Sequence, residues 1–309
     1  MHAMYLTQSG GADALVRGEI PTPIPQRGEV LVKVRATAVT PTELQWFPTF
    51  HTAKGYARPF PIVLGHEFSG EIAALGPDVD GSRIGDAVYG LNDWFTNGAQ
   101  AEFAVAPIAT LAMKPVTLTH PQAAVVPISA LTAWQGLVTR TGLKAGERVL
   151  IHGAAGGVGV FAVQLARALG AHVIATASSG NLEFVRSLGA HEVIDYRVTR
   201  FEDVARDIDV VFDGIGGETL ARSWGVLAPG GRLVTIATES AGAPEPRVRE
   251  AFLLVQSDRM QLAEIARRID AGELRVFVEK EFPLTEARAA YARAARGGMR
   301  GKIVLRAGE

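Results

Sequence analysis

The sequence predicts an α/β fold in which a doubly wound parallel sheet is inserted into a β-rich domain. Three observations support this. The first third of the chain consists of short strand-like runs separated by glycine and proline; strand-like and helix-like runs alternate after Pro121; and the end of the chain returns to short strand-like runs. We expect the β-rich domain to span residues 1–120 plus 263–309 and the inserted domain to span residues 121–262.

Residues 29–36 form the clearest strand of the β-rich part. Their sequence EVLVKVRA alternates Val30, Val32 and Val34 with other side chains, as expected for a strand with one buried face. Glycine and proline separate the runs that follow, which is typical of turns between short strands. The further strands expected here span residues 62–64, 69–75, 87–89 and 101–105.

The inserted part alternates strictly between the two element types. The expected strands span residues 148–152, 172–176, 192–195, 210–212 and 232–236, and the expected helices span 123–140, 158–169, 181–188, 201–207 and 217–226. Such alternation implies right-handed crossovers and a parallel sheet with helices on both faces. The tail has a helix at 260–271 and strands at 275–280 and 302–305, which is too little to fold alone. We therefore expect the tail to join the first domain.

Composition excludes several classes of function. The 309 residues are 48% hydrophobic and 20% charged with a net charge of −1, which gives no general attraction to nucleic acid or to an anionic membrane. The start lacks a secretory signal pattern, and the longest apolar run, 123–138, is shorter than the roughly 20 residues of a membrane span. We expect a cytoplasmic protein with a small-molecule partner. The absence of cysteine excludes disulfides, thiolate zinc ligands and cysteine nucleophiles.

The segment RVLIHGAAGGVG at residues 148–159 has the order strand, glycine-rich turn and helix start. It matches the G-x-G-x-x-G pattern, with alanine at the first position. A glycine pattern alone is often only a turn, but the flanking strand and helix and the further βα units favour a Rossmann dinucleotide-binding domain. The helix start then offers free N–H groups to the cofactor pyrophosphate. The expected contacts are Ala154, Ala155, Gly156, Gly157, Val158 and Gly159.

The end of the second expected strand favours NADPH over NADH. NAD-binding domains place Asp or Glu about 20 residues after the turn, whereas residues 176–181 read TASSGN and the first carboxylate is Glu183. The small polar side chains of Ser178, Ser179 and Asn181 suit a 2′-phosphate. Alternatively, Ser178 and Asn181 cap a helix, and the two roles are compatible. The arginines nearest in sequence are Arg186, Arg197 and Arg200.

Further motifs follow one another along the chain: VLGHEFSGEI at 63–72, IGDAVYG at 84–90, ALTAWQGL at 130–137, LGAHEVIDY at 188–196, VVFDGIGG at 210–217 and RGKIVL at 300–305. Together with the glycine turn they resemble the zinc-independent quinone oxidoreductase (zeta-crystallin-like) group of the medium-chain dehydrogenases/reductases. The resemblance covers nearly the whole chain. It implies a Rossmann domain inserted in a GroES-like domain built from both chain ends, NADPH-dependent reduction of a quinone or an α,β-unsaturated carbonyl, and a homodimer.

The same resemblance implies further cofactor contacts. It places Thr132 by the cofactor, Ser178, Asn181 and Tyr196 by the 2′-phosphate, and Gly214, Ile215 and Gly216 by the ribose. The nicotinamide side would be approached by Ile236, Ala237, Thr238, Phe252, Leu253 and Leu254.

Zinc-dependent members of that family hold their metal with a cysteine after an early strand and with the histidine of a Gly-His-Glu motif. This chain has Thr40 in the region of the cysteine, although it retains His66 and Glu67. We therefore expect no metal, with His66 and Glu67 serving as hydrogen-bonding groups in the cleft wall. Because zinc can use histidine and carboxylates alone, a zinc-type alcohol dehydrogenase is an alternative hypothesis.

The chemistry that these residues support is hydride transfer, in which the cofactor performs the difficult step. No catalytic residue is evident. The expected substrate pocket residues are Thr40, Gln45, Trp46, His66, Asn92 and Trp94, whose aromatic members either stack on a flat acceptor or pack within the β-rich domain. A second hypothesis is a low-turnover NADPH-binding sensor or scaffold. A short-chain dehydrogenase is disfavoured because Tyr291 is followed by Ala295 where that family has lysine.

Overall fold

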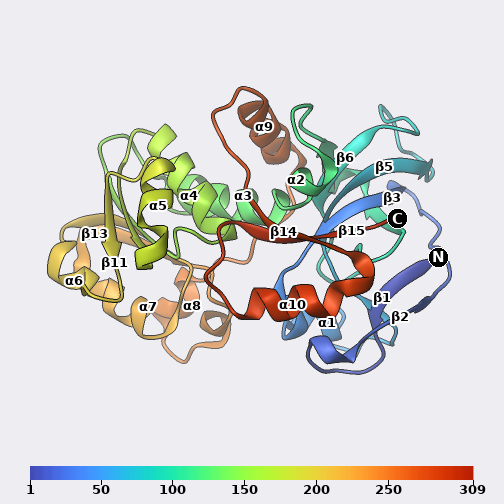
Figure 1. Ribbon diagram of the computed structural model, residues 1–309, viewed down its shortest axis with the longest axis horizontal. Coiled ribbons are helices and arrows are strands. Elements are labelled where there is room, and N and C mark those ends of the chain that lie inside the picture. Colours follow the sequence, from blue (N-terminus) through green and yellow to red (C-terminus); the bar gives the residue numbers. More distant parts are fainter. Residues whose placement is uncertain (309) are drawn as a thin grey trace.

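A five-stranded parallel sheet forms the centre of the inserted domain, in the order β11-β10-β9-β12-β13 (Figure 1). The structure is a computed structural model and describes residues 1–308. The strands are β9 Arg148–His152, β10 His172–Ala177, β11 Glu192–Asp195, β12 Ile208–Asp213 and β13 Leu227–Thr235. The direction of winding reverses between β9 and β12, so a ligand cleft is expected at the carboxyl ends of these two strands.

Helices cover both faces of this sheet, because successive strand residues point to opposite sides. Val149 and Ile151 of β9 belong to one apolar cluster with α3, α4 and α9, whereas Leu150 belongs to a second cluster with α6 and α7. The predicted doubly wound α/β class is confirmed. The helix bounds are α2 His120–Ala124, α3 Pro127–Trp134, α4 Gly157–Ala168, α5 Leu182–Ser187, α6 Phe201–Val204, α7 Gly217–Ser223, α8 Pro246–Ala251 and α9 Arg259–Asp270.

The single helix expected over residues 123–140 is wrong in detail. The chain forms α2, then α3, and then a π-helical turn at Gln135–Arg140. Pro127 occupies the first turn of α3, where its missing N–H costs no hydrogen bond, so a new helix begins there. A capping box between Thr119 and Gln122 fixes the start of α2.

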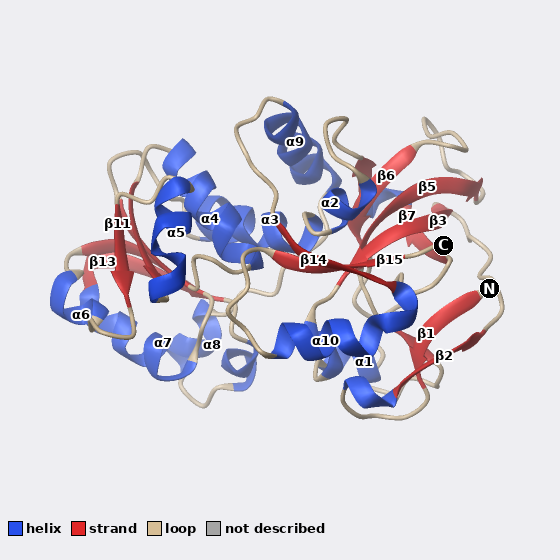
Figure 2. Cartoon of the chain, in the orientation of Figure 1, coloured by secondary structure: helices blue, strands red, loops and turns tan. Residues whose placement is uncertain are grey.

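The β-rich domain contains a larger sheet in the order β14-β15-β3-β5-β6-β8, with β7 also paired to β3, and a small sheet in the order β2-β1-β4. Figure 2 shows β1, β2, β3, β5 and β6 at the opposite end of the molecule from β11 and β13, with β14 near the middle. Their bounds are β1 His2–Leu6, β2 Leu15–Glu19, β3 Glu29–Ala38, β4 Ile62–Val63, β5 Glu67–Leu75, β6 Ala87–Leu91, β7 Phe103–Pro107, β8 Leu111–Met113, β14 Val278–Pro283 and β15 Lys302–Arg306. Two helices accompany them, α1 Phe47–Phe50 and α10 Ala287–Ala295.

The end of the chain returns to the β-rich domain. Strand β15 pairs antiparallel with β3, so that Val304 lies opposite Ala38, and β14 runs parallel to β15. The tail thus joins the sheet of the first third, although the residue boundaries expected for the two domains stay a prediction. Within residues 1–308, no helix combines the length and the apolar character needed to cross a membrane.

Candidate functional site

The turn between β9 and α4 is closely packed on itself. Gly153 has a φ of +75°, which L-residues rarely adopt, and a Cβ on Gly159 would lie 2.2 Å from the Gly153 carbonyl oxygen. The residue of this turn with left-handed backbone angles is therefore Gly153, and not Ala154, which occupies the first position of the glycine pattern. The sequence analysis did not single out Gly153. Helix α4 starts after Gly156 with no side-chain cap, so its first N–H groups are free to bind an anion.

Two polar side chains from other elements lie beside the start of α4. A Cβ on Gly157 would lie 3.2 Å from the Ser129 hydroxyl oxygen and 3.5 Å from Cδ of Lys302. Ser129 is 1% exposed, and its hydroxyl has no hydrogen-bond partner among residues 1–308. Because a buried polar atom usually has a partner, an orphaned hydroxyl beside free helix N–H groups fits a phosphate. The residues present therefore fit a dinucleotide.

A cavity of about 360 Å³ lies between the two domains, next to this turn. The β-rich domain contributes residues after β3 and at the start of β15, and the inserted domain contributes α3, the start of α4 and the loops after β12 and β13. Many of the expected site residues meet in its lining: Thr40, Trp46, Thr132, Gly157, Val158, Gly214, Ile215, Ile236, Ala237, Thr238, Phe252, Leu253 and Leu254. The lining also includes Ile128, Ser129, Glu239 and Lys302, which the sequence did not suggest.

Four of the expected pocket residues, Gln45, His66, Asn92 and Trp94, lie outside this lining. Asn92 is buried, and its side-chain amide donates to the carbonyl oxygens of Asn97 (3.2 Å) and Val105 (2.9 Å). Trp94 stands behind Trp46, with ring centroids 4.7 Å apart, and donates to the Val255 carbonyl oxygen at 3.0 Å. Trp94 therefore supports the cavity from behind by joining the two domains.

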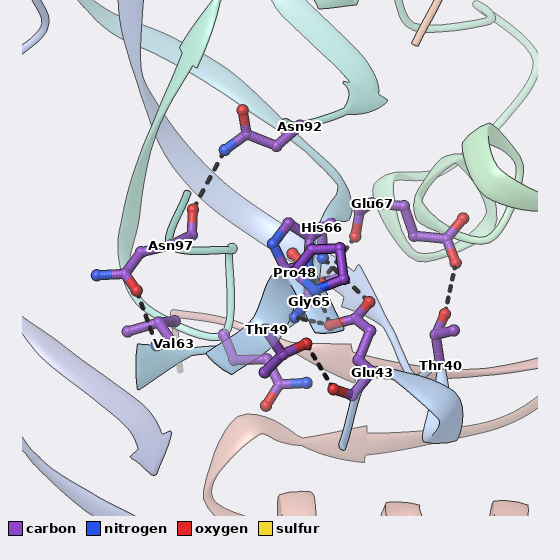
Figure 3. Close-up of polar contacts among 12 residues, drawn as sticks. Thr40, Glu43, Pro48, Thr49, Val63, Gly65, His66, Glu67, Asn92 and Asn97 are labelled. Carbon is purple, nitrogen blue, oxygen red and sulfur yellow. Dashed lines mark hydrogen bonds and ion pairs between the residues drawn. The ribbon is translucent and has the colours of Figure 1, made fainter. Parts of the chain in front are cut away.

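The two ring nitrogens of His66 both have partners within the β-rich domain, and Figure 3 shows the contact with Glu43. Its Nδ1 lies 3.1 Å from Oε2 of Glu43 and its Nε2 lies 3.1 Å from the Thr96 carbonyl oxygen. Burial alone would raise the pKa of Glu43, but the charge of His66 and N–H donation from His66 and Gly65 hold it below the ordinary value. Both ring nitrogens of His66 therefore already face an oxygen atom within hydrogen-bond distance.

Glu67 lies under the cavity and joins four elements. One carboxylate oxygen contacts Nζ of Lys302 and, at 3.5 Å, the Thr40 hydroxyl, and the other accepts from the Ile128 N–H at 2.9 Å. Glu67 is completely buried, and burial raises the pKa of its carboxyl against the opposing effect of Lys302. The structure thus gives His66 and Glu67 the hydrogen-bonding role expected from the sequence, although neither lines the cavity.

These residues do not fit a zinc ion. A histidine binds zinc through a ring nitrogen that has no other partner, and both nitrogens of His66 lie 3.1 Å from oxygen atoms of Glu43 and Thr96. Within residues 1–308, no group of three or more His, Asp or Glu side chains is arranged to hold a metal. The sequence contains no cysteine.

The cofactor's adenosine end would lie at the carboxyl end of β10. Ser178 and Asn181 occupy cap positions, but neither side chain makes a capping hydrogen bond. Tyr196 is 58% exposed beside them, and its N–H donates to Ala177. Asp195, which the sequence reasoning did not consider, accepts a hydrogen bond from the Ser179 hydroxyl.

Two of the three arginines that the sequence placed nearby pair with glutamates. Arg186 pairs with Glu183, and Arg200 pairs with Glu202, which also binds Arg222. Arg197 contacts Asp195 through its backbone N–H, at 3.0 Å.

Comparisons with known proteins agree with this geometry. Residues 26–116 match the family described as alcohol dehydrogenase GroES-like domain, and residues 188–305 match the family described as zinc-binding dehydrogenase. The mouse (Mus musculus) mitochondrial NAD(P)H oxidoreductase RTN4IP1 is 32% identical over 90% of this chain and 81% of its own length.

The chain is also similar over its whole length to solved structures. The quinone oxidoreductase from Coxiella burnetii superposes with a TM-score of 0.91 and 32% identity, and the match covers 100% of this chain and 99% of that one. The mycobacterial protein Rv1454c, solved in complex with NADPH, has a TM-score of 0.83 and 29% identity, over 99% of this chain and 100% of that one.

Proposed function

We propose that this chain uses NADPH to reduce a quinone or an α,β-unsaturated carbonyl without a metal. The chain belongs to the quinone oxidoreductase-like group of the medium-chain dehydrogenase/reductase family and is an NAD(P)H-dependent oxidoreductase. The observation that carries the proposal is the interdomain cavity beside the glycine turn. Its walls are mainly apolar side chains and backbone, which suits hydride transfer to a flat, electron-poor acceptor.

The cofactor would extend across the mouth of this cavity. The start of α4, with Ser129 and Lys302 beside it, would hold the pyrophosphate. The loop after β10 would hold the adenosine ribose, and the segments 236–238 and 252–254 would lie beside the nicotinamide. The acid-free segment 176–181 and the NADPH named for the Rv1454c structure favour NADPH.

When bound, NADPH supplies the hydride, and the chain binds and orients the acceptor. Trp46 offers an aromatic surface in the lining for the acceptor ring. The Thr40 hydroxyl is free to donate to the acceptor's oxygen, because its bond to Glu67 is long, at 3.5 Å. Thr132, by contrast, already donates to the Ile128 carbonyl oxygen at 2.5 Å. We propose that Thr40 stabilises the oxygen on which negative charge develops, and that water delivers the final proton.

NADPH oxidation measured with a panel of quinones and enones tests the activity. We expect turnover with at least one acceptor. If NADPH binds by thermal shift but no acceptor in the panel is reduced, the proposed reductase activity is refuted and the sensor or scaffold hypothesis is favoured. Elemental analysis of dialysed protein tests the metal-free proposal, which is supported by the engaged ring of His66. Stoichiometric zinc, with activity lost on chelation, would favour a zinc-type dehydrogenase instead.

Two further features are proposals of the same kind. We propose a homodimer formed through the Rossmann domain, and light scattering measures its mass. The cytoplasmic location stays a prediction, because the RTN4IP1 relative is named as mitochondrial. We propose no nucleic acid or membrane partner, consistent with the net charge of −1.

A further inference from the structure

The loop after β10 is bound by an arginine from the other domain. Arg300 lies just before β15 in the β-rich domain, far from this loop in sequence. Its Nε donates to Oδ1 of Asn181 at 2.8 Å, and its Nη2 donates to the Gly180 carbonyl oxygen at 2.7 Å. The guanidinium carbon also lies 5.2 Å from the centre of the Phe184 ring. The arginine thus crosses between the domains and ends at the segment expected to bind the adenosine ribose.

The neighbouring residue holds Arg300 at this position. The N–H of Gly301 donates to the Ala155 carbonyl oxygen at 3.0 Å, and Gly301 forms a parallel bridge with Gly156 of the glycine turn. A Cβ on Gly301 would lie 2.1 Å from the Phe277 carbonyl oxygen, so no larger residue fits there without a backbone shift. The backbone next to Arg300 is therefore bonded to the same turn that would bind the pyrophosphate.

An acid stands at the same end of the sheet. Asp195 closes β11, accepts from the Ser179 hydroxyl and from the Arg197 N–H at 3.0 Å, and both bonds lower the pKa of its carboxyl. Its negative charge at neutral pH repels a phosphate and attracts a ribose hydroxyl. The candidate arginines Arg186 and Arg200 already pair with glutamates, and Arg197 contacts Asp195 through its backbone N–H. A 2′-phosphate at this loop therefore meets Asp195 on one side and needs a cation on the other.

We propose that Arg300 is the residue that binds the 2′-phosphate of NADPH, and that Asp195 opposes it and allows NADH to bind weakly. This inference rests on the proposed NADPH function. Guanidinium has five N–H donors in one plane, and the structure uses only two of them within residues 1–308. The free N–H groups at Nη1 suit phosphate oxygens. Cofactor preference is then decided by a cation of the substrate-side domain and not by the Rossmann domain alone.

Isothermal titration of the full chain with 2′,5′-ADP and with 5′-AMP tests the inference without any turnover. The wild type should bind 2′,5′-ADP more tightly. Arg300→Gln should weaken 2′,5′-ADP by about 10- to 100-fold, the range expected for lost charged hydrogen bonds, and leave 5′-AMP within about threefold. Arg300→Lys should fall between the two, because it keeps the charge and loses the planar donors. Asp195→Asn should tighten 2′,5′-ADP.

Arg186→Gln is the matched control, since Arg186 lies on the same loop-helix unit and pairs with Glu183; it should leave both affinities unchanged. Equal binding of 2′,5′-ADP by the wild type and Arg300→Gln, with a wild-type preference for 2′,5′-ADP, would overturn this inference alone. A wild type that does not prefer 2′,5′-ADP would overturn the NADPH assignment and the inference with it. A melting temperature for Arg300→Gln within a few degrees of the wild type confirms that the variant is folded.

Discussion

Replacing Lys302 with Met should destabilise the protein by about 3–5 kcal/mol, the usual cost of removing one partner from a buried ion pair. Lys302 contacts Glu67, which is completely buried, and within residues 1–308 the other carboxylate oxygen of Glu67 accepts only from the Ile128 N–H. Methionine fills a similar volume but leaves the carboxylate charge uncompensated. With an unfolding entropy of about 2.1 cal/mol/K per residue, the loss corresponds to a melting temperature lower by about 5–8 °C for 309 residues.

The loss should depend on pH in a defined direction. The folded-state pKa of Glu67 is already raised above its ordinary value of 4.5 by burial, and removal of Lys302 raises it further. Folding then favours the protonated form, so the stability of the variant is fully present below pH 4.5 and is lost as the pH rises through the folded pKa. Lys302→Met should therefore be closest to the wild type in mild acid and weakest near pH 8.

Thermal unfolding at pH 5 and pH 8 measures this effect for the wild type, Lys302→Met, Glu67→Gln and the double variant. The double variant has no buried charge, so it should be more stable than Lys302→Met at pH 8 and should respond less to pH. Comparing the two variants that lack Lys302 cancels the titration of all other groups. The reasoning is refuted if Lys302→Met melts within about 1 °C of the wild type at pH 8, or if adding Glu67→Gln lowers its stability further.

Three other predictions use the same site. Gly159→Ala should weaken NADPH binding and cost about 1–3 kcal/mol of stability, because its Cβ would lie 2.2 Å from the Gly153 carbonyl oxygen; Gly225→Ala, which meets nothing within 4 Å, is the control in a thermal-shift titration. Thr40→Val should lower kcat for quinone reduction by about 10- to 100-fold with KM for NADPH unchanged, whereas Thr40→Ser should retain activity; equal kcat for both variants would remove Thr40 from the mechanism. Glu43 has a lowered folded-state pKa, so its stabilising effect is present above pH 4.5 and is lost as the pH falls below it. In Glu43→Gln, the free energy of unfolding measured with urea should therefore fall less steeply below pH 4.5 than in the wild type. An equally steep fall in both proteins would contradict an ionised Glu43 in the folded state.

The helices and strands that have a clear local sequence pattern were predicted correctly. Strands β9 and β11 have the expected bounds. Strand β9 is a short and mostly buried run between turn residues, as expected of a central parallel strand, whereas β11 is the edge strand and contains the apolar pair Val193 and Ile194. Helix α10 was missed although its buried positions, Ala287, Ala290, Tyr291 and Ala294, have helical spacing. Three of these residues are alanines, so the apolar stripe is too weak to detect in a sequence. Strands β1 and β2 were also missed, and each is only five residues long.

The site was only partly predictable, because its charged groups are paired across long sequence distances. The glycine turn is local and was found, apart from Gly153. Lys302 lies 235 residues from Glu67, and Arg300 lies 119 residues from Asn181. Nothing within a short window of sequence indicates such pairs. His66 was expected to face the cleft because it belongs to a recognisable motif, and the structure instead turns its ring toward Glu43, whose carboxylate no local pattern links to it.

The placement of the last strand explains why so much of the site depends on three consecutive residues. Because β15 pairs with β3 at the boundary between the domains, the segment before and at its start passes along the open side of the glycine turn. Arg300 contacts the loop after β10, Gly301 bonds to the turn, and Lys302 contacts Glu67 beneath the cavity. A chain that inserts its Rossmann domain between two halves of another domain thus uses the second half to complete the proposed cofactor site. Cofactor binding and docking of the two domains then depend on the same contacts, and each should stabilise the other.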